Sequence, residues 1–215
     1  MRPRTQIILL SLAAILAIAF VLAVVLDRPQ SRSPSGVSTG APKVFPSSSG
    51  FDGAAIPPGP PAPGFTLTDQ HVHTVSLGGL RGRVVVLTFL YSTCGATCIL
   101  IAQQIRGALD ELPHSVPVLI VSADPVADTP ASVAHFLAQV SLAGRVRYLT
   151  GSPAQLRQVW RAYRVRPAAA GRARFDKFAF LLLLDARGRE RVLFEPAVLT
   201  PEALAHDVRR LQAES

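Results

Sequence analysis

Residues 83–98 read RVVVLTFLYSTCGATC, a nearly continuous apolar run followed by two cysteines four positions apart. The apolar part is rich in β-branched residues and does not alternate with polar ones. This pattern is typical of a strand that is covered on both faces in a parallel sheet. We therefore expect residues 83–90 to form the central strand. Cys94 and Cys98, the only cysteines in the chain, follow it directly.

The segments on either side of this strand predict a mixed sheet with helices. Residues 95–112 have apolar side chains at helical spacing, and residues 116–122 again have the pattern of a buried strand. Together with the central strand they predict a right-handed βαβ unit. Two antiparallel hairpins are predicted, 65–68 with 72–77 and 178–184 with 190–194.

Three further helices are predicted from their start signals. A hydroxyl residue caps a helix N-terminus, and proline fits the first helical position. Such pairs occur at Thr129–Pro130, Ser152–Pro153 and Thr200–Pro201. The resulting order of elements predicts an α/β fold of the thioredoxin-like class, with a central mixed sheet flanked by helices and an added N-terminal β-hairpin.

The two cysteines are the main candidates for chemistry. A helix that begins near residue 95 would place Cys98 in its first turn, and the i to i+4 spacing would put both sulfurs on one side. The positive end of the helix dipole would favour thiolate over thiol. Such a pair suits either a soft metal ion held by two thiolates or a reversible dithiol/disulfide couple.

The N-terminal residues predict a membrane segment. Residues 7–26 are apolar except for Ser11, a length that matches a bilayer core of about 30 Å. Arg2 and Arg4 precede this run and favour a cytoplasmic N-terminus. We expect residues 1–28 to be a retained single-pass transmembrane anchor, with the rest of the chain on the periplasmic side of the cell membrane. A cleaved signal peptide is the alternative, although no small-x-small site ends the apolar run.

The composition after the apolar run predicts where the domain begins. Pro, Ser and Gly dominate residues 29–63, which we interpret as a flexible linker, and residues 64–215 as the thioredoxin-like domain. The net charge of +8 is largely due to arginine, and one cluster consists of Arg157, Arg161, Arg164, Arg166, Arg172 and Arg174. We interpret this cluster as a solvated surface, with an acidic partner or anionic headgroups as the alternative. No nucleic-acid motif accompanies it, so a nucleic-acid partner is not expected.

Four segments in this order resemble the Sco/SenC family: FLYSTCGATC (89–98), VSADPVADTP (121–130), YLTGSPAQLRQVWRAYRV (148–165) and FDKFAFLLLLDARG (175–188). Its members are membrane-tethered, thioredoxin-like proteins that bind copper and help to assemble the copper centre of cytochrome c oxidase. The resemblance implies a copper ion as ligand and an oxidase subunit that carries a copper centre as partner. It also implies other copper chaperones or thioredoxin-like reductants as further partners.

The resemblance assigns metal binding and redox chemistry to Cys94 and Cys98. In the family a histidine that follows an aspartate is the third copper ligand; the aspartate matches Asp176, but the next residue here is Lys177. A lysine ammonium has no lone pair until it loses its proton, near pH 10.4. Two thiolates alone can still hold cuprous ion, whereas a protonated lysine beside them would lower the thiol pKa and favour redox chemistry.

Three functions therefore stay open. The first is an assembly factor that binds copper, the second a thiol-disulfide reductase that acts on a partner's cysteines, and the third a scaffold that no longer binds copper. A metallochaperone or redox assembly factor is expected rather than a turnover enzyme.

The remaining candidate ligands are less specific. His71 and His73 would share one side of an early strand and could form a metal pair, but hairpin histidines are more often solvated surface residues. The other histidines are His114, His135 and His206. Asp124 and Asp128 match the family pattern; a position at a helix start explains Asp128, and neither is assigned to a metal site.

Overall fold

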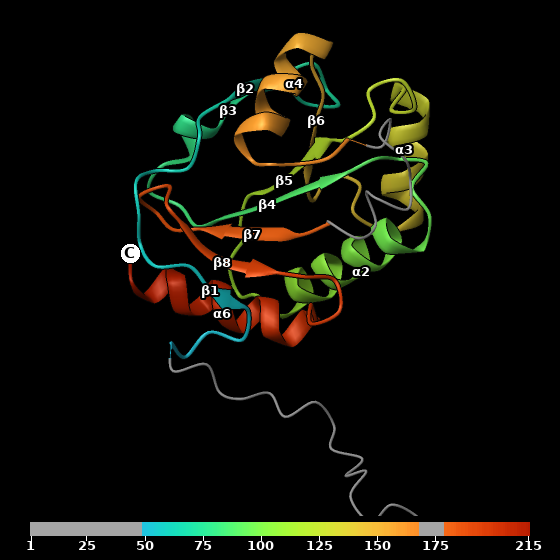
Figure 1. The fold of residues 1–215 in the computed structure, drawn as a ribbon. Coiled ribbons are helices and arrows are strands. Elements are labelled where there is room, and N and C mark those ends of the chain that lie inside the picture. The colour runs from blue at the N-terminus through green and yellow to red at the C-terminus, as the bar shows by residue number, and fades with distance from the viewer. Residues whose placement is uncertain (1–48, 168–178) are drawn as a thin grey trace, which may run out of the picture. The chain divides into compact units, whose positions relative to one another are not determined.

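The computed structural model describes residues 49–167 and 179–215, so the expected anchor and Lys177 lie outside the described residues. A six-stranded sheet in the order β1-β8-β7-β4-β5-β6 forms the centre of the fold (Figure 1). Its strands are β1 (Ala54–Ala55), β4 (Val85–Leu90), β5 (Val118–Ser122), β6 (Arg147–Leu149), β7 (Leu181–Leu184) and β8 (Glu190–Phe194). A separate antiparallel hairpin consists of β2 (Thr66–Thr68) and β3 (Thr74–Ser76), followed by the 3-10 turn η1 (Leu77–Leu80).

Strand β4 occupies the interior of this sheet, as its apolar run predicts. It pairs in parallel with β5 and antiparallel with β7, and all six of its residues are buried. The sheet is therefore mixed. Thr88, the polar residue of the strand, donates its hydroxyl to the carbonyl of Phe180 at 2.8 Å, so the buried hydroxyl is satisfied.

Helices cover both faces of the sheet (Figure 1). Val86 and Leu90 of β4 face a core formed with α2 (Ala96–Glu111), α3 (Pro130–Gln139) and α6 (Pro201–Ala213). Val85, Leu87 and Phe89 face a second core formed with α4 (Pro153–Ala162) and the β2–β3 hairpin. The alternation follows from the period of two along a strand and confirms the thioredoxin-like layering.

The three predicted helix starts are confirmed. Thr129, Ser152 and Thr200 are the N-caps of α3, α4 and α6, and each side-chain oxygen accepts a backbone N–H of the first turn. The side-chain carbonyl of Gln155 in turn accepts the backbone N–H of Ser152, which completes a capping box.

Two strands have no counterpart in the sequence-based prediction. Strand β6 has only three residues, too few to show a period. Strand β1 pairs with β8 at the edge of the sheet and falls inside the range 29–63 that we interpreted as a linker. The buried carboxylate of Asp207 on α6 accepts the N–H groups of Asp52 and Gly53 at 2.9 and 3.0 Å, which ties the chain before β1 to the domain.

The part of the chain that the structure describes contains no helix long and apolar enough to cross a bilayer. The apolar run 7–26, on which the predicted anchor rests, is not within that part.

Candidate functional site

The cysteine pair lies where the central strand meets its helix. Gly95 is the N-cap of α2, so Cys94 precedes the helix and Cys98 lies in its first turn, as the sequence predicts. The N–H of Cys94 donates to the carbonyl of Tyr91 at 3.1 Å, which folds the connection back on itself. The two sulfurs form a disulfide, with the Cα atoms 5.7 Å apart.

The disulfide is part of the core between the sheet and α2. Cys98 is fully buried, and Cys94 is 6 % exposed. A reductant or metal that reaches the pair from solvent therefore meets Cys94 first. The bond is an oxidised dithiol, and its two-electron reduction would release two sulfur donors one helical turn apart.

Asp128 holds the strand ends around the cysteine connection. One carboxylate oxygen accepts the N–H of Ser92, two residues before Cys94, at 2.6 Å. The other accepts the hydroxyls of Ser122 at 2.5 Å and Tyr148 at 2.8 Å. Ser92 follows β4, Ser122 ends β5 and Tyr148 lies within β6, so a single buried carboxylate joins three neighbouring strands to the start of the cysteine connection.

Burial has the largest effect on the pKa of Asp128. Desolvation raises the pKa of Asp128, and the hydrogen bonds from Ser122, Ser92 and Tyr148 oppose that rise only in part. Burial, together with the nearby charge of Asp128, also raises the pKa of Tyr148 well above its usual value. The tyrosine therefore remains a hydroxyl donor throughout the physiological range.

We expect Asp128→Asn to reveal this raised pKa in the pH dependence of stability. A raised folded-state pKa means that the stabilisation is complete below the unfolded value, near 3.8, and is lost as the pH rises through the folded value. Asparagine resembles the protonated acid but does not titrate. The wild-type free energy of unfolding, measured by urea denaturation, should thus fall relative to that of the variant as the pH rises. A difference that grows in favour of the wild type would contradict the assignment.

Among the described residues, no histidine forms a metal-binding cluster with the cysteines. His71 and His73 lie exposed in the turn before β3, with ring centroids 6.2 Å apart, and His73 faces the carboxylate of Asp69 at 3.5 Å. His114 and His135 are exposed as well. Within residues 49–167 and 179–215, no cluster of three metal-binding side chains includes Cys94 or Cys98.

One such cluster lies elsewhere in the described residues, at Asp52, His206 and Asp207. The Nδ1 atom of His206 is 3.2 Å from the Asp52 carboxylate and 2.9 Å from that of Asp207. Asp207 also accepts two backbone N–H groups from the chain before β1. The contacts of this cluster therefore have a structural role, in which they hold that segment against α6.

The sequence profile of the SCO1/SenC family matches residues 56–213, which are most of the chain and include every strand of the described sheet except β1. The chain belongs to the SCO1/SenC family. Lys177, which stands where the family pattern has a histidine, and the matching Asp176 lie outside the described residues. No curated protein sequence matches the chain.

Solved Sco structures have the same fold. Copper-bound ScoI of Bradyrhizobium japonicum is 27% identical, with a TM-score of 0.54 over 71% of this chain and 99% of that chain. Apo Sco1 of Thermus thermophilus is 21% identical, with a TM-score of 0.60 over 75% of this chain and 96% of that one. BsSco, described as a Sco-family cytochrome c oxidase assembly protein with a disulfide switch, is 20% identical, with a TM-score of 0.59 over 72% and 95%.

Sequence reasoning identified the cysteine pair of this Sco domain but missed the role of Asp128. The sequence suggested a carboxylate at a helix start beside the Thr129 cap. Thr129 does cap α3, but the carboxylate of Asp128 is buried and binds residues of other elements. Tyr148 could have indicated that role, because the hydroxyl of a tyrosine in a buried strand needs a hydrogen-bond partner.

Proposed function

We propose that this chain is a Sco-type factor that binds cuprous ion through Cys94 and Cys98 and takes part in assembling the copper centre of cytochrome c oxidase. Its site of action is outside the cytoplasmic membrane, as the apolar run 7–26 suggests. The observation that carries the proposal is the disulfide between Cys94, just before α2, and Cys98, in its first turn. Copper-bound family members and the disulfide switch of BsSco support it.

The donor set fits cuprous ion. Thiolates are soft ligands, and the helix N-terminus favours their ionised form. The disulfide must first accept two electrons and two protons from a dithiol, which is itself oxidised to a disulfide. A thioredoxin-like reductant would supply that dithiol, and the oxidase subunit that carries the copper centre would receive the ion.

Dithiol reduction of a partner is the second candidate, and the same disulfide favours it. In that case Cys94, as the more exposed sulfur, attacks a partner disulfide and Cys98 resolves the mixed disulfide. A scaffold without chemistry is the outcome if neither activity is found.

Titration of the reduced domain with cuprous ion, in competition with a chromophoric chelator, tests the proposal. We expect one ion to bind per reduced domain and none to bind to the oxidised domain. Equal binding by the two forms would exclude the cysteine site. A reduction potential above about −300 mV without copper binding would favour the reductase.

We expect Lys177→His to tighten copper binding. The resemblance to the family places residue 177 at the position of the third ligand, and imidazole offers a neutral nitrogen donor near pH 7. Loss of a residue that only hydrogen-bonds to a metal ligand changes metal affinity by about 10–100-fold, so a new ligand should raise cuprous affinity at least that much. The same chelator competition measures it, with Lys177→Gln as the control for loss of charge. Equal affinities of the two variants would leave residue 177 without a role in the site.

A further inference from the structure

The arginines of α4 have no acidic partners among the described residues. Arg157 and Arg161 lie exposed on the helix and Arg164 just after it. None of the three forms an ion pair with a described residue. The sequence from Thr129 to Phe175 contains no Asp or Glu, and its charged side chains are all arginines. Within the described residues, no acidic side chain therefore pairs with the positive charges of this surface, which we name the α4 arginine face.

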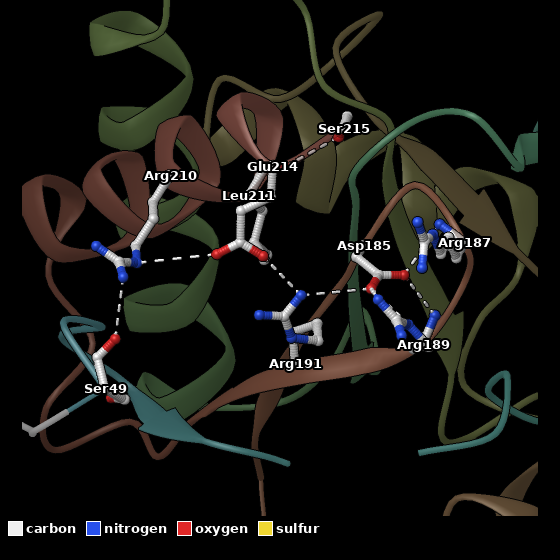
Figure 2. Close-up of polar contacts among 9 residues, drawn as sticks. All are labelled: Ser49, Asp185, Arg187, Arg189, Arg191, Arg210, Leu211, Glu214 and Ser215. Atoms are coloured by element: carbon white, nitrogen blue, oxygen red, sulfur yellow. Dashed lines mark hydrogen bonds and ion pairs between the residues drawn. The ribbon is translucent and has the colours of Figure 1, made fainter. Parts of the chain in front are cut away.

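Several arginines elsewhere in the domain form ion pairs. Figure 2 shows the network around the β7–β8 turn and the end of α6, in which Arg189 contacts Asp185 at 2.7 Å and Arg191 contacts Glu214 at 2.7 Å. Arg210 approaches the same glutamate at 4.0 Å. The α4 arginine face differs from this network because its arginines form no ion pair with a described residue.

Helix α4 packs against the carboxyl ends of β4 and β5, close to where the chain leaves β4 toward the cysteines. The indole N–H of Trp160 donates to the carbonyl of Ser122, the last residue of β5, at 2.9 Å. The ring of Tyr163 lies 5.5 Å from that of Phe89 in β4. Ser122 pairs with Leu90, which lies four residues before Cys94. These contacts therefore place the C-terminal half of α4 beside the carboxyl ends of β4 and β5, where the chain leaves β4 toward the cysteines.

The side chains between the arginines argue against a bilayer as the partner. Membrane-surface helices insert large apolar side chains next to their basic residues. The exposed residues of α4 other than arginine are Pro153, Ala154, Gln155, Gln158 and Ala162. The exposed large apolar side chains of the described residues all lie on other elements.

We propose that the α4 arginine face docks an acidic surface of the protein with which the cysteine pair exchanges copper or electrons. Guanidinium groups suit this role because each can bind a carboxylate through two parallel hydrogen bonds. A cluster of one sign also steers an oppositely charged partner and speeds its association. The proposal rests on the proposed function and adds the chemistry of the partner.

The first test uses disulfide-linked dimers of three short peptides, with cysteine flanked by glutamates, lysines or serines. Cys94 of the reduced domain attacks the peptide disulfide and releases one peptide thiol; Cys98 then displaces the second, which restores the Cys94–Cys98 disulfide. At low ionic strength we expect the glutamate peptide to react about tenfold or more faster than the lysine peptide. Salt near 0.5 M should remove the preference, since it shortens the screening length to a few ångströms.

Two triple variants test whether the preference for the glutamate peptide depends on the α4 arginines. Arg157→Glu with Arg161→Glu and Arg164→Glu should abolish the preference for the glutamate peptide. The control changes the net charge equally through Arg83→Glu, Arg187→Glu and Arg209→Glu, exposed residues outside α4 that form no ion pair with a described residue. The control should retain most of the preference. Equal losses in both variants would show that net charge alone acts and would overturn the proposal.

Two further measurements separate this proposal from the alternatives. A glutamate peptide with serine in place of cysteine should shift amide resonances of α4 in the NMR spectrum, whether or not the dithiol reacts; shifts elsewhere alone would overturn the docking surface. Failure of the serine-flanked dimer to react would instead count against the redox function. Sedimentation with phosphatidylglycerol vesicles that depends on the α4 arginines, without any glutamate preference, would assign the face to a membrane and overturn the proposal.

Discussion

Cys94→Ser is expected to abolish tight binding of cuprous ion by the reduced domain. The substitution removes one of two sulfur donors and leaves Cys98 alone in the first turn of α2, where the described residues offer no cluster of ligands to replace it. A hydroxyl is a poor donor for a soft ion. The affinity, measured by chelator competition, should fall by more than about 100-fold, since losing a residue that only hydrogen-bonds to a metal ligand already lowers affinity by up to about that factor.

Thr93→Ser provides the matched control for this loss. Thr93 is exposed in the same connection, and its substitution leaves both sulfurs in place. We expect its copper affinity to equal that of the wild type. Retention of tight binding by Cys94→Ser would move the copper site away from the cysteine pair and exclude the proposed metal function.

Trp160→Ala is expected to be among the most destabilising substitutions on α4. The indole is 8 % exposed and packs in the core between α4 and the sheet, so its removal leaves a large cavity. Substitutions of this kind cost about 3–5 kcal/mol, a large part of the 5–15 kcal/mol typical of a folded domain. Urea denaturation at constant pH measures the free energy of unfolding.

A second substitution at this position separates packing from hydrogen bonding. Trp160→Phe retains an aromatic ring but removes the donor to the carbonyl of Ser122, which should cost about 1–3 kcal/mol. The exposed neighbour Arg161→Ala should change stability by no more than about 0.5 kcal/mol. Equal losses for the alanine and phenylalanine variants would show that the ring contributes little through packing.

Local patterns in the sequence were sufficient for the main elements of the domain. The β-branched run before Cys94 specified a strand buried on both faces, because only such a position tolerates unbroken apolar residues. The hydroxyl–proline pairs specified three helix starts, because capping involves atoms within one turn. The spacing of Cys94 and Cys98 likewise placed both at the start of α2.

Short or irregular segments could not be predicted in this way. Strand β1 has two residues in a stretch rich in proline and glycine, and it exists because β8 offers an open edge and Asp207 accepts the preceding N–H groups. Neither partner is near it in the sequence.

The sequence by itself determined the order of the main elements without β1 and β6, the cysteine pair and the resemblance to the Sco/SenC family, since each depends on residues close together along the chain. Only the tertiary structure showed that Asp128 joins three neighbouring strands to the residues before Cys94. It also showed that Arg191 of β8 meets Glu214 at the end of α6, whereas the α4 arginines form no ion pair with a described residue. These features arise from side chains that folding brings together from distant positions, and no local period records such contacts.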